Sequence, residues 1–579
     1  MKWFVWILTP TLFFGSVQYN VVFNGVEEKI VEVALEKSSE LVLLKNRFPP
    51  SVRALEYRVQ SDLPKLYQVL HAFGYYDAAI YPEIEQDTHP VTVRLLIYPG
   101  MRYKIGLFKL QYLHDVEKPA LLMQDIGLKK GDFVDAKTVL LSPKKLLRFL
   151  ADRNYPLAQV QKENYSIDRK KKTIHGTIVV DSGPKTRFGP LLITGLKSVK
   201  TDYVVRKMQF QEGDLYDENL VEASQKRLID TQLFSSVLFT HGEELDEEGE
   251  LPIKLQIAES KHKNIGIGVS YATIDGPGAS IGWQNRNIAG EGHILAFDLD
   301  VAKTYSVGSL SYKVPDFFHK NQSYLARAEM AREDITVYLA RTYTLLQRIE
   351  REWQNHFFLS IGLGASHIDV NKSIANNHFS LVSAPFSFRY RNVDNLLNTT
   401  KGMIIIYKFA PYTAVAPTHT TFCKQLMTIN TYFPLMENRF LVFAIRSQVG
   451  SIAGSSLNRI PFTKRFLGGS DENLRGYRYK TVSPLNKEGD PTGGRSAIYN
   501  SLEMRMRLTE TIGVVPFFDI GKVGDAAFPD MRGKWLKSVG VGLRYFLFFG
   551  PLRLDVGFPL NKRPFDDTYK IYISIGQTF

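Results

Sequence analysis

The sequence contains very little cysteine and tryptophan, with one Cys and five Trp in 579 residues. A single cysteine, Cys423, excludes an internal disulfide framework and any metal site built from cysteine pairs. Cys423 lies in an apolar, strand-like stretch, so we interpret it as a small hydrophobic side chain. The 12 histidines are scattered without metal-site spacing, and no nucleophile elbow or phosphate-binding loop occurs. We therefore expect no enzyme activity, no cofactor and no metal.

Long apolar runs are also missing. After the N-terminus no run of about 18 apolar residues occurs, which excludes a conventional spanning helix there. Residues 3–14 are the exception: they are apolar, follow Lys2 and precede Gly15-Ser16. This stretch is too short to span and predicts a secretory signal peptide over residues 1–16, although its cleavage site is poor. A buried N-terminal strand or an uncleaved anchor is the alternative.

Charge is biased toward one sign, with 72 Lys and Arg against 59 Asp and Glu, a formal net charge of +13. Such a surplus favours anionic surfaces. No basic helix and no aromatic RNA-binding motif accompanies it, so we expect no nucleic-acid partner. For a secreted chain, lipid headgroups or lipopolysaccharide fit the charge better.

The N-terminal part repeats at intervals of about 80 residues. The aromatics Tyr75, Tyr155 and Phe234 each mark the passage from a helical pattern into a strand, 80 and 79 residues apart. Gly131-Asp132 recurs as Gly213-Asp214, 82 residues later. The first repeat lacks this Gly-Asp pair. The pattern predicts three related α+β domains, over residues 17–101, 102–185 and 186–261.

Each repeat is predicted to run strand, helix, helix, strand, strand. A three-stranded sheet with two helices on one face leaves a sheet edge unpaired, and such an edge can accept a strand from a partner. Three simple spacer domains are the alternative.

After about residue 262 the hydrophobic period becomes 2. Residues 264–271, 296–301 and 540–545 alternate apolar residues with glycine, polar or charged ones. A soluble sandwich seldom keeps this pattern over 300 residues, whereas a transmembrane barrel requires it, with apolar side chains toward lipid and polar ones toward the lumen. We predict an antiparallel barrel of sixteen strands over residues 262–579, with one long loop, 450–495.

That loop carries Arg475-Gly476-Tyr477. On the following strands, the alternation turns Glu503 and Asp519 toward the lumen. Two carboxylates on adjacent strands suit the planar fork of one guanidinium, so we predict that Arg475 is clamped between them. The alternative is a solvated Arg475 in an extracellular loop, with carboxylates that only wet the lumen.

The motifs resemble those of the outer-membrane POTRA-barrel (BamA/TamA) superfamily. Arg475-Gly476-Tyr477 is similar to its Arg-Gly-Phe/Tyr loop motif, and Phe517-x-Asp519-x-Gly521 to its strand motif. The resemblance implies that the three repeats are POTRA domains 1, 2 and 3. It also implies that the loop enters the lumen as a latch, with Glu503, Asp519, Phe517 and Gly521 as its partners. Arg495 departs from the pattern, since related chains have a polar residue there.

Three POTRA domains before a barrel look like the TamA branch of this family. That likeness implies an assembly factor that inserts or translocates autotransporters and other outer-membrane protein clients, together with a TamB-like partner anchored in the inner membrane. It also implies a role with outer-membrane lipids. A two-partner-type secretion pore and a phospholipid conduit are the alternatives.

The first and last strands of the barrel form the predicted lateral gate. Gly266 and Gly268 weaken the first strand, next to Ile265, because glycine packs no side chain. The chain ends in Phe579, three residues after Gly576, on what is predicted to be a final amphipathic strand. A terminal aromatic resembles the assembly signal of outer-membrane barrels, and an interfacial anchor is the alternative. Opening of this seam would expose an edge to a client strand.

Overall fold

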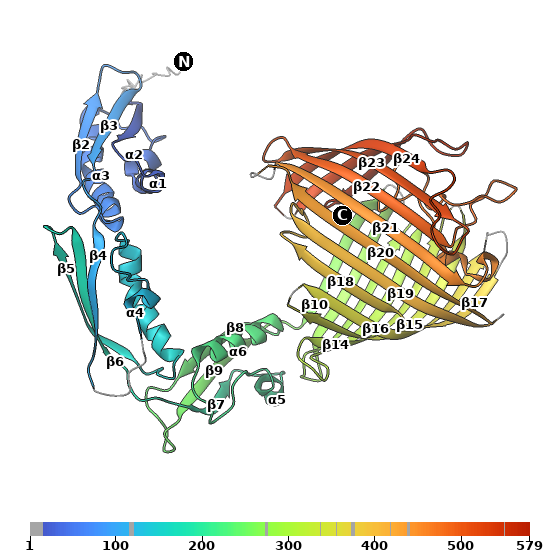
Figure 1. Cartoon of the computed structure of the whole chain (residues 1–579), viewed down its shortest axis with the longest axis horizontal. Helices are drawn as coiled ribbons and strands as arrows, with labels where there is room; N and C mark the ends of the chain where they lie inside the picture. Colours follow the sequence, from blue (N-terminus) through green and yellow to red (C-terminus); the bar gives the residue numbers. More distant parts are fainter. Residues whose placement is uncertain are drawn as a thin grey trace, which may run out of the picture. The chain divides into compact units, whose positions relative to one another are not determined.

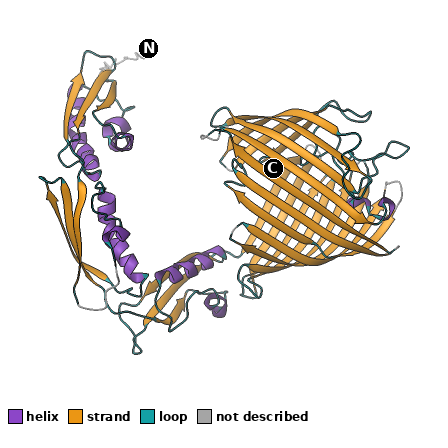
Figure 2. Ribbon diagram, viewed as in Figure 1, coloured by secondary structure: helices purple, strands orange, loops and turns teal. Residues whose placement is uncertain are grey.

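The computed structural model shows three small sheets followed by one large sheet (Figures 1 and 2). No described helix is long and apolar enough to cross a membrane. Apart from its last residue, the predicted signal peptide lies outside the described residues. The structure describes residues 16–114, 121–272, 276–335, 337–354, 356–371, 377–416, 419–436, 440–548 and 550–579.

The three small sheets share one topology, which confirms the predicted α+β repeats. In each sheet the last strand of the repeat lies in the middle. It is parallel to the first strand in all three repeats and antiparallel to the second strand in the first two. The first repeat comprises β1 Tyr19–Asn24, α1 Lys29–Ser38, α2 Glu40–Leu43, α3 Val52–Ala72, β2 Ala79–Glu85 and β3 Val91–Tyr98. The second comprises β4 Lys104–Tyr112, η1 Met123–Ile126, α4 Ala136–Ala151, β5 Gln159–Asp168 and β6 Thr173–Asp181. The third comprises β7 Phe188–Thr194, α5 Thr201–Val205, α6 Glu218–Asp230, β8 Phe234–His241 and β9 Leu251–Glu259.

Amphipathic elements hold each repeat together. In the first repeat the buried face of β3 carries Val93 and Leu95, while α3 contributes Leu66 and Leu70 at helical spacing. The Ser51 hydroxyl starts α3 by accepting a hydrogen bond of 3.2 Å from the backbone N–H of Ala54. The first helix of the second repeat is a single 3-10 turn, shorter than the predicted helix.

The large sheet contains 17 hydrogen-bonded strands within the described residues, in sequence order from β10 to β26. Sixteen were predicted. β17 and β18 both pair with β16 on one side and with β19 on the other, because one strand path is interrupted at Ala384-Pro385. The number sixteen stays a prediction that depends on counting these two as one. The strands are β10 Lys263–Ala272, β11 Gly276–Ile288, β12 His293–Ala302, β13 Tyr305–Pro315, β14 Gln322–Asp334, β15 Leu339–Trp353, β16 Phe357–Asn371, β17 Asn377–Ser383, β18 Phe386–Val393, β19 Gly402–Ala416, β20 Thr420–Pro434, β21 Leu441–Gly454, β22 Ser496–Arg507, β23 Ile512–Gly524, β24 Leu536–Leu547, β25 Gly550–Pro559 and β26 Lys570–Ile575.

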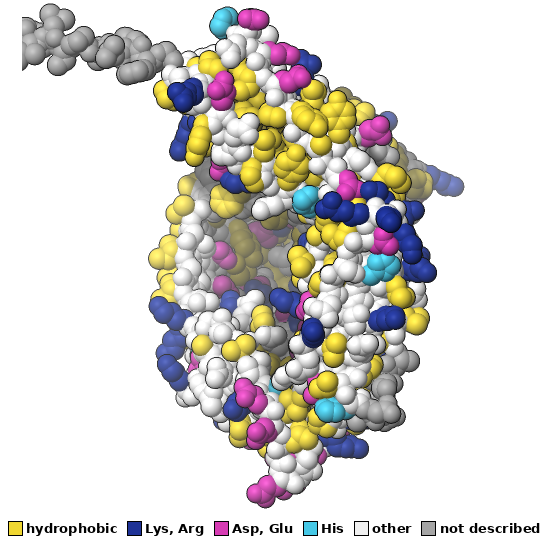
Figure 3. Space-filling view, turned by 90° about the vertical axis from the view of Figure 1, so that its left-hand side faces the viewer, with side chains coloured by type: hydrophobic (Ala, Val, Ile, Leu, Met, Phe, Trp, Pro, Cys, Tyr) yellow, Lys and Arg dark blue, Asp and Glu magenta, His cyan; other side chains and the backbone are white. Residues whose placement is uncertain are grey.

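The strands present opposite chemistry on their two faces. On β22, Met504 is exposed on the outer face, whereas the neighbouring Glu503 and Arg505 are buried inside. An apolar outer face and a polar interior are typical of a membrane barrel. The space-filling view shows charges of both signs among hydrophobic side chains on its visible face (Figure 3), so net charge alone identifies no partner surface.

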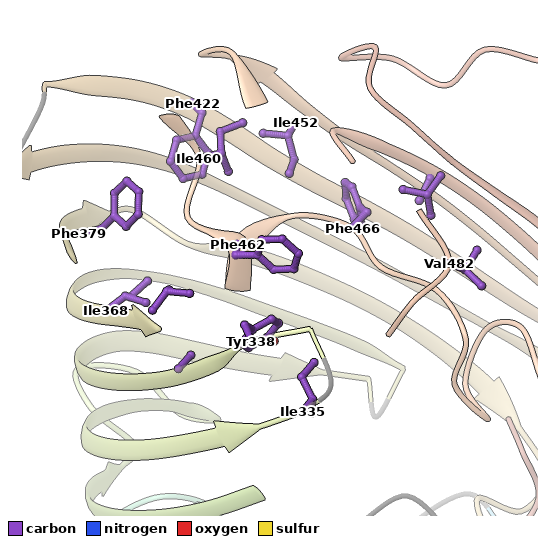
Figure 4. Packing of buried hydrophobic residues seen from close by; sticks show 14 of the residues in the cluster. Ile335, Tyr338, Ile368, Phe379, Phe422, Ile452, Ile460, Phe462, Phe466 and Val482 are labelled. Atoms are coloured by element: carbon purple, nitrogen blue, oxygen red, sulfur yellow. The ribbon is translucent and has the colours of Figure 1, made fainter. Parts of the chain in front are cut away.

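One long segment, residues 455–495, folds back against the inner wall; we call it the lumen loop. It begins later than the predicted residue 450, because β21 stays paired with β20 as far as Gly454. Two 3-10 turns, η2 Leu457–Arg459 and η3 Phe462–Lys464, lie near its start. Phe462 and Phe466 of the loop share a buried core with Ile368 and Phe422 of the wall (Figure 4). This apolar packing keeps the loop inside the barrel.

The barrel has a seam where its first and last strands meet. β10 and β26 come close together, yet no hydrogen-bonded ladder joins them in the described part of the chain. β26 ends at Ile575, and the backbone turns at Gly576, whose φ is +93°. The prediction of a final strand reaching Phe579 is therefore wrong.

Candidate functional site

Arg475 lies at the centre of a buried ion cluster. Its Nε and Nη2 donate to the two carboxylate oxygens of Asp519, each at 2.8 Å. Its Nη1 donates to Glu503 at 2.7 Å and to Asp555 at 3.0 Å. The structure thus brings Arg475 together with both predicted carboxylates, and the bidentate contact matches the planar guanidinium.

Neighbouring strands supply these partners because their inward positions are in register. Glu503 stands on β22 directly opposite Phe517 of β23, and Asp519 follows two residues later on the same face. The guanidinium carbon of Arg475 lies 3.5 Å from the centroid of the Phe517 ring, a close cation–π contact. Phe517 is therefore a direct partner of the arginine.

Asp555 on β25 was missed by sequence reasoning. It is fully buried, and its inward phase could have been found from the alternation of Arg553-Leu554-Asp555. Nothing in the local sequence shows that the loop arginine reaches this far around the wall, because that contact depends on the curvature of three strands. The cluster therefore spans β22, β23 and β25.

Three further arginines balance the charge. Arg505 contacts Glu503 at 2.9 Å, Arg544 contacts Asp555 at 2.5 Å, and Arg553 contacts Asp471 at 2.7 Å. Four guanidinium groups thus face four carboxylates, so the set is formally neutral. Burying a charge is costly unless it is paired, which makes each member depend on the others. We call the latch cluster Arg475, Glu503, Asp519, Asp555, Arg505, Arg544, Arg553 and Asp471.

Gly476 allows the loop backbone to touch the wall. Its φ is +89°, a left-handed conformation that favours glycine. A Cβ at this position would lie 3.1 Å from the backbone nitrogen of Pro559, and one at Gly557 would lie 2.9 Å from the nitrogen of Gly476. Two facing glycines therefore let Arg475 reach its carboxylates.

Tyr477 and Gly521 have different tasks. The Tyr477 hydroxyl donates to the carbonyl of Lys537 at 2.7 Å, which ties the loop to β24. Gly521 makes no contact of this kind: a Cβ there would lie 2.6 Å from the Tyr499 ring. It provides room for Tyr499, which packs in the same core as the loop.

The C-terminal tail enters the lumen and joins the latch cluster. Arg505 donates to the carbonyl of Phe579 at 2.8 Å, and Arg475 Nη1 approaches the Thr578 hydroxyl at 3.4 Å. The Phe579 ring packs near Tyr432, with ring centroids 6.3 Å apart. Phe579 is thus not part of a lipid-facing strand, because the turn at Gly576 redirects the chain inward.

The predicted gate residues on the first strand have few neighbours. Ile265 is 72% exposed on the outer face of β10. A Cβ added at Gly266 or at Gly576 would meet no atom within 4 Å, whereas one at Gly268 would lie 2.5 Å from the Ser280 hydroxyl. One side of the seam is therefore loosely packed.

Small α+β domains, a lipid-compatible barrel and an arginine-latched lumen loop together define a membrane-barrel protein with periplasmic-type repeats. The Omp85 superfamily domain profile matches residues 287–579, about half of the chain, and the POTRA profile, described as surface antigen variable number repeat, matches residues 186–260. The chain belongs to the Omp85 superfamily.

Relatives of known identity agree with this family. The chain is 24% identical over 528 residues to the outer membrane protein assembly factor BamA of Nitratidesulfovibrio vulgaris, covering 87% of this chain and 66% of that one. It is 23% identical over 329 residues to BamA of Buchnera aphidicola, covering 55% and 53%. The chain thus spans between half and two thirds of the length of these two relatives.

A solved structure shows the same fold. The crystal structure of BamA from Haemophilus ducreyi lacking POTRA domains 1–3 aligns with a TM-score of 0.72 at 18% identity, covering 82% of this chain and 99% of that one. The family, its relatives and this fold locate the chain in the bacterial outer membrane, with its POTRA domains in the periplasm.

Proposed function

We propose that the chain is a TamA-type outer-membrane assembly factor that promotes insertion or secretion of β-barrel clients, autotransporters among them. The observation that carries this proposal is the seam: β10 and β26 lie close together without a hydrogen-bonded ladder. The names of the relatives, which are outer membrane protein assembly factors, support the same class of activity.

A seam without a hydrogen-bonded ladder can accept a client strand, because lipid cannot satisfy free backbone N–H and C=O groups. A client strand that pairs with the edge of β10 removes that cost. The turn at Gly576 and the inward course of Thr578 and Phe579 support such opening, since the tail turns into the lumen instead of extending β26 along β10. In this mechanism the latch cluster holds β22, β23 and β25 rigid while the β10 side moves.

Disulfide locking tests the gate. After Cys423→Ala, a cysteine at Ile265 or Ile267 of β10 is combined with one at Ile571 or Ile573 of β26, and client assembly is followed before and after reduction. We expect the oxidised pairs that form to stop assembly, and reduction to restore it.

The matched control links two strands that backbone hydrogen bonds already join. Leu543 and Leu554 are directly paired on β24 and β25 and both face outward. A disulfide between these positions should leave assembly unchanged. Assembly that proceeds normally with a fully locked β10–β26 seam contradicts the gate.

A TamB-like partner anchored in the inner membrane is part of the proposal. Each small sheet has two edge strands within the described residues, since only its middle strand is flanked by strands on both sides. Such edges accept an added strand through main-chain hydrogen bonds. Site-specific photocrosslinking from the outer edges of β1 and β2 in the full chain should capture this partner; capture only from the helical faces contradicts strand addition.

The two alternatives predict different phenotypes. A two-partner-type secretion pore predicts ion conductance and one secreted client, whereas a phospholipid conduit predicts altered outer-membrane lipids with normal barrel assembly. The packed lumen loop favours neither a permanently open pore nor free lipid passage through the lumen. Depletion followed by profiling of both outer-membrane barrels and lipids separates the three.

A further inference from the structure

Two histidines and an aspartate meet on the outer face of the barrel. His367 and Asp369 lie two residues apart on β16 and so share one face. His378 on β17 stands directly opposite Asp369 in the register. One nitrogen from each imidazole and one carboxylate oxygen lie within 4.8 Å of one another. Spacing along the chain does not reveal this group, because the two histidines lie on different strands.

The contacts within the group already point to a shared centre. Nε2 of His367 lies 3.2 Å from Oδ1 of Asp369, and Nδ1 of His378 is directed at that same oxygen. The other ring nitrogen of His367, Nδ1, lies 3.0 Å from the Ser380 hydroxyl on β17. Histidines that bind metals are commonly oriented in this way by a hydrogen bond at the second nitrogen.

The position is reachable from outside the cell. β10 begins at the periplasmic side, and antiparallel alternation brings the end of β16 to the extracellular rim. His367 and His378 have side-chain exposures of 49% and 67%, and Asp369 has 23%. Polar side chains on the lipid face cost little near the interface, so the rim can carry such a group.

We propose that His367, Asp369 and His378 form a binding site for a divalent transition-metal ion of the zinc type. Two imidazoles and a carboxylate are a ligand set that Zn²⁺ accepts, with a fourth position left for water or an external ligand. The ion would sit among the three donors in place of the proton-mediated contacts. It would join β16 to β17 by a cross-strand link at the extracellular rim.

Zinc titration of the full chain tests the site. The protein, purified in detergent without a polyhistidine tag and stripped of metal, is titrated with ZnCl2 by calorimetry. We expect one ion per chain in the tightest phase. His378→Gln and His367→Gln should each weaken that phase by at least about tenfold, since even outer-sphere changes cost 10–100-fold. Ser380→Ala should weaken it less.

His241→Gln provides the matched control, because His241 is an exposed histidine on β8, in a different unit of the chain. Its titration should match that of the unmodified chain. Cu²⁺ added in place of Zn²⁺ gives a second readout: electron paramagnetic resonance should count two nitrogen ligands, and one in His378→Gln.

Two results would overturn the proposal. One is a tightest phase that is unchanged when both histidines are replaced; the other is a Cu²⁺ spectrum with the same nitrogen count in His378→Gln. Gel mobility before and after heating shows whether each variant is still a folded barrel. Loss of binding counts only in variants that pass this check. If one histidine variant does not pass it, the titration and the copper spectrum of the other variant decide.

Discussion

The two walls that meet at the seam are built differently. On the side of β22 to β25, inward positions such as Glu503, Asp519 and Asp555 are fully buried and ion-paired with the lumen loop. On the side of β10 to β12, the inward positions include the exposed Asp298 and the open Gly266. One wall is held by a charge cluster, and the other has little inside to hold it.

This difference indicates where motion can occur. A buried, mutually dependent ion cluster resists rearrangement, because displacing one member leaves another charge unpaired. A glycine-rich strand with few side-chain contacts opens at low cost. The lumen loop therefore acts as a brace for the last strands, and in the gate that we propose the first strand is the movable side.

Replacing Arg475 with Ala should reduce the difference between the two walls more than any other substitution considered below. Three carboxylates would lose their shared cation, and breaking a buried pair costs about 3–5 kcal/mol. We expect a large drop in the temperature at which the barrel loses its compact form, measured by heat-dependent gel mobility, together with impaired client assembly.

Lys487→Ala is the control for that variant, since Lys487 is an exposed cation in the same loop. Arg475→Lys should be intermediate, because an ammonium keeps the charge but cannot form the bidentate contact. An Arg475→Ala barrel with unchanged heat stability and activity would rule out the latch.

Glu259 holds a segment that lies close to the start of β10. Its carboxylate accepts backbone hydrogen bonds from Lys197, Ser198 and Val199 at 2.7–2.9 Å, just before β10 begins. Burial alone would raise the pKa of Glu259, but these bonds and the Ser198 hydroxyl outweigh it and lower the pKa from 4.5 to about 2. The contact is therefore stabilising above pH 4.5 and is lost as the pH falls toward 2.

At neutral pH this contact contributes on the order of 3 kcal/mol. Glu259→Gln should speed hydrogen exchange of the amides of residues 197–199 at pH 6, as measured by mass spectrometry. The difference from the unmodified chain should shrink as the pH falls from 4.5 toward 2, because Glu259 is then protonated in the opened segment before it is protonated in the closed one. A difference that stays constant with pH means that the charge of Glu259 is not what holds this segment.

Much of the architecture could be predicted because it depends on local periodicity. The switch to period 2 indicated the barrel, and the same alternation turned Glu503, Asp519 and Phe517 inward, as the structure has them. Asp555 has the same inward phase, but its contact with Arg475 depends on how the loop crosses the lumen. That path is a tertiary property with no local signal.

The C-terminus and the histidine group likewise could not be predicted from local periodicity. Alternation continues to the last residues, so a strand was predicted to reach Phe579, and only the turn at Gly576 redirects the tail. The meeting of His367 with His378 depends on strand register, which one residue of slip would change. Periodicity identifies faces, whereas register and loop paths determine which faces meet.

Gly476→Ala tests whether close backbone approach is needed for the latch. A left-handed φ costs a non-glycine residue about 1–2 kcal/mol, and here the added Cβ would also lie 3.1 Å from the Pro559 nitrogen. Gly489→Ala is a matched control in the same loop, with φ +88° and no atom within 4 Å of its Cβ. We expect Gly476→Ala to lower heat stability more than Gly489→Ala; equal effects would mean that conformation alone matters.

Tyr477→Phe should have the smallest effect, and it tests whether the contact of the lumen loop with β24 depends on the Arg475 contacts. The substitution removes only the hydroxyl that donates to the Lys537 carbonyl on β24, a hydrogen bond typically worth about 0.5–1.5 kcal/mol. The ring and its cation–π contact with Arg563 remain, 5.4 Å from guanidinium carbon to ring centroid. We therefore expect a small decrease in heat stability with normal client assembly.

Combined with Arg475→Ala, the loss of heat stability caused by Tyr477→Phe should be less than additive, because a loop already released from its carboxylates no longer holds Tyr477 against β24. Full additivity would instead make β24 an independent attachment point, and the brace would then have two separate parts.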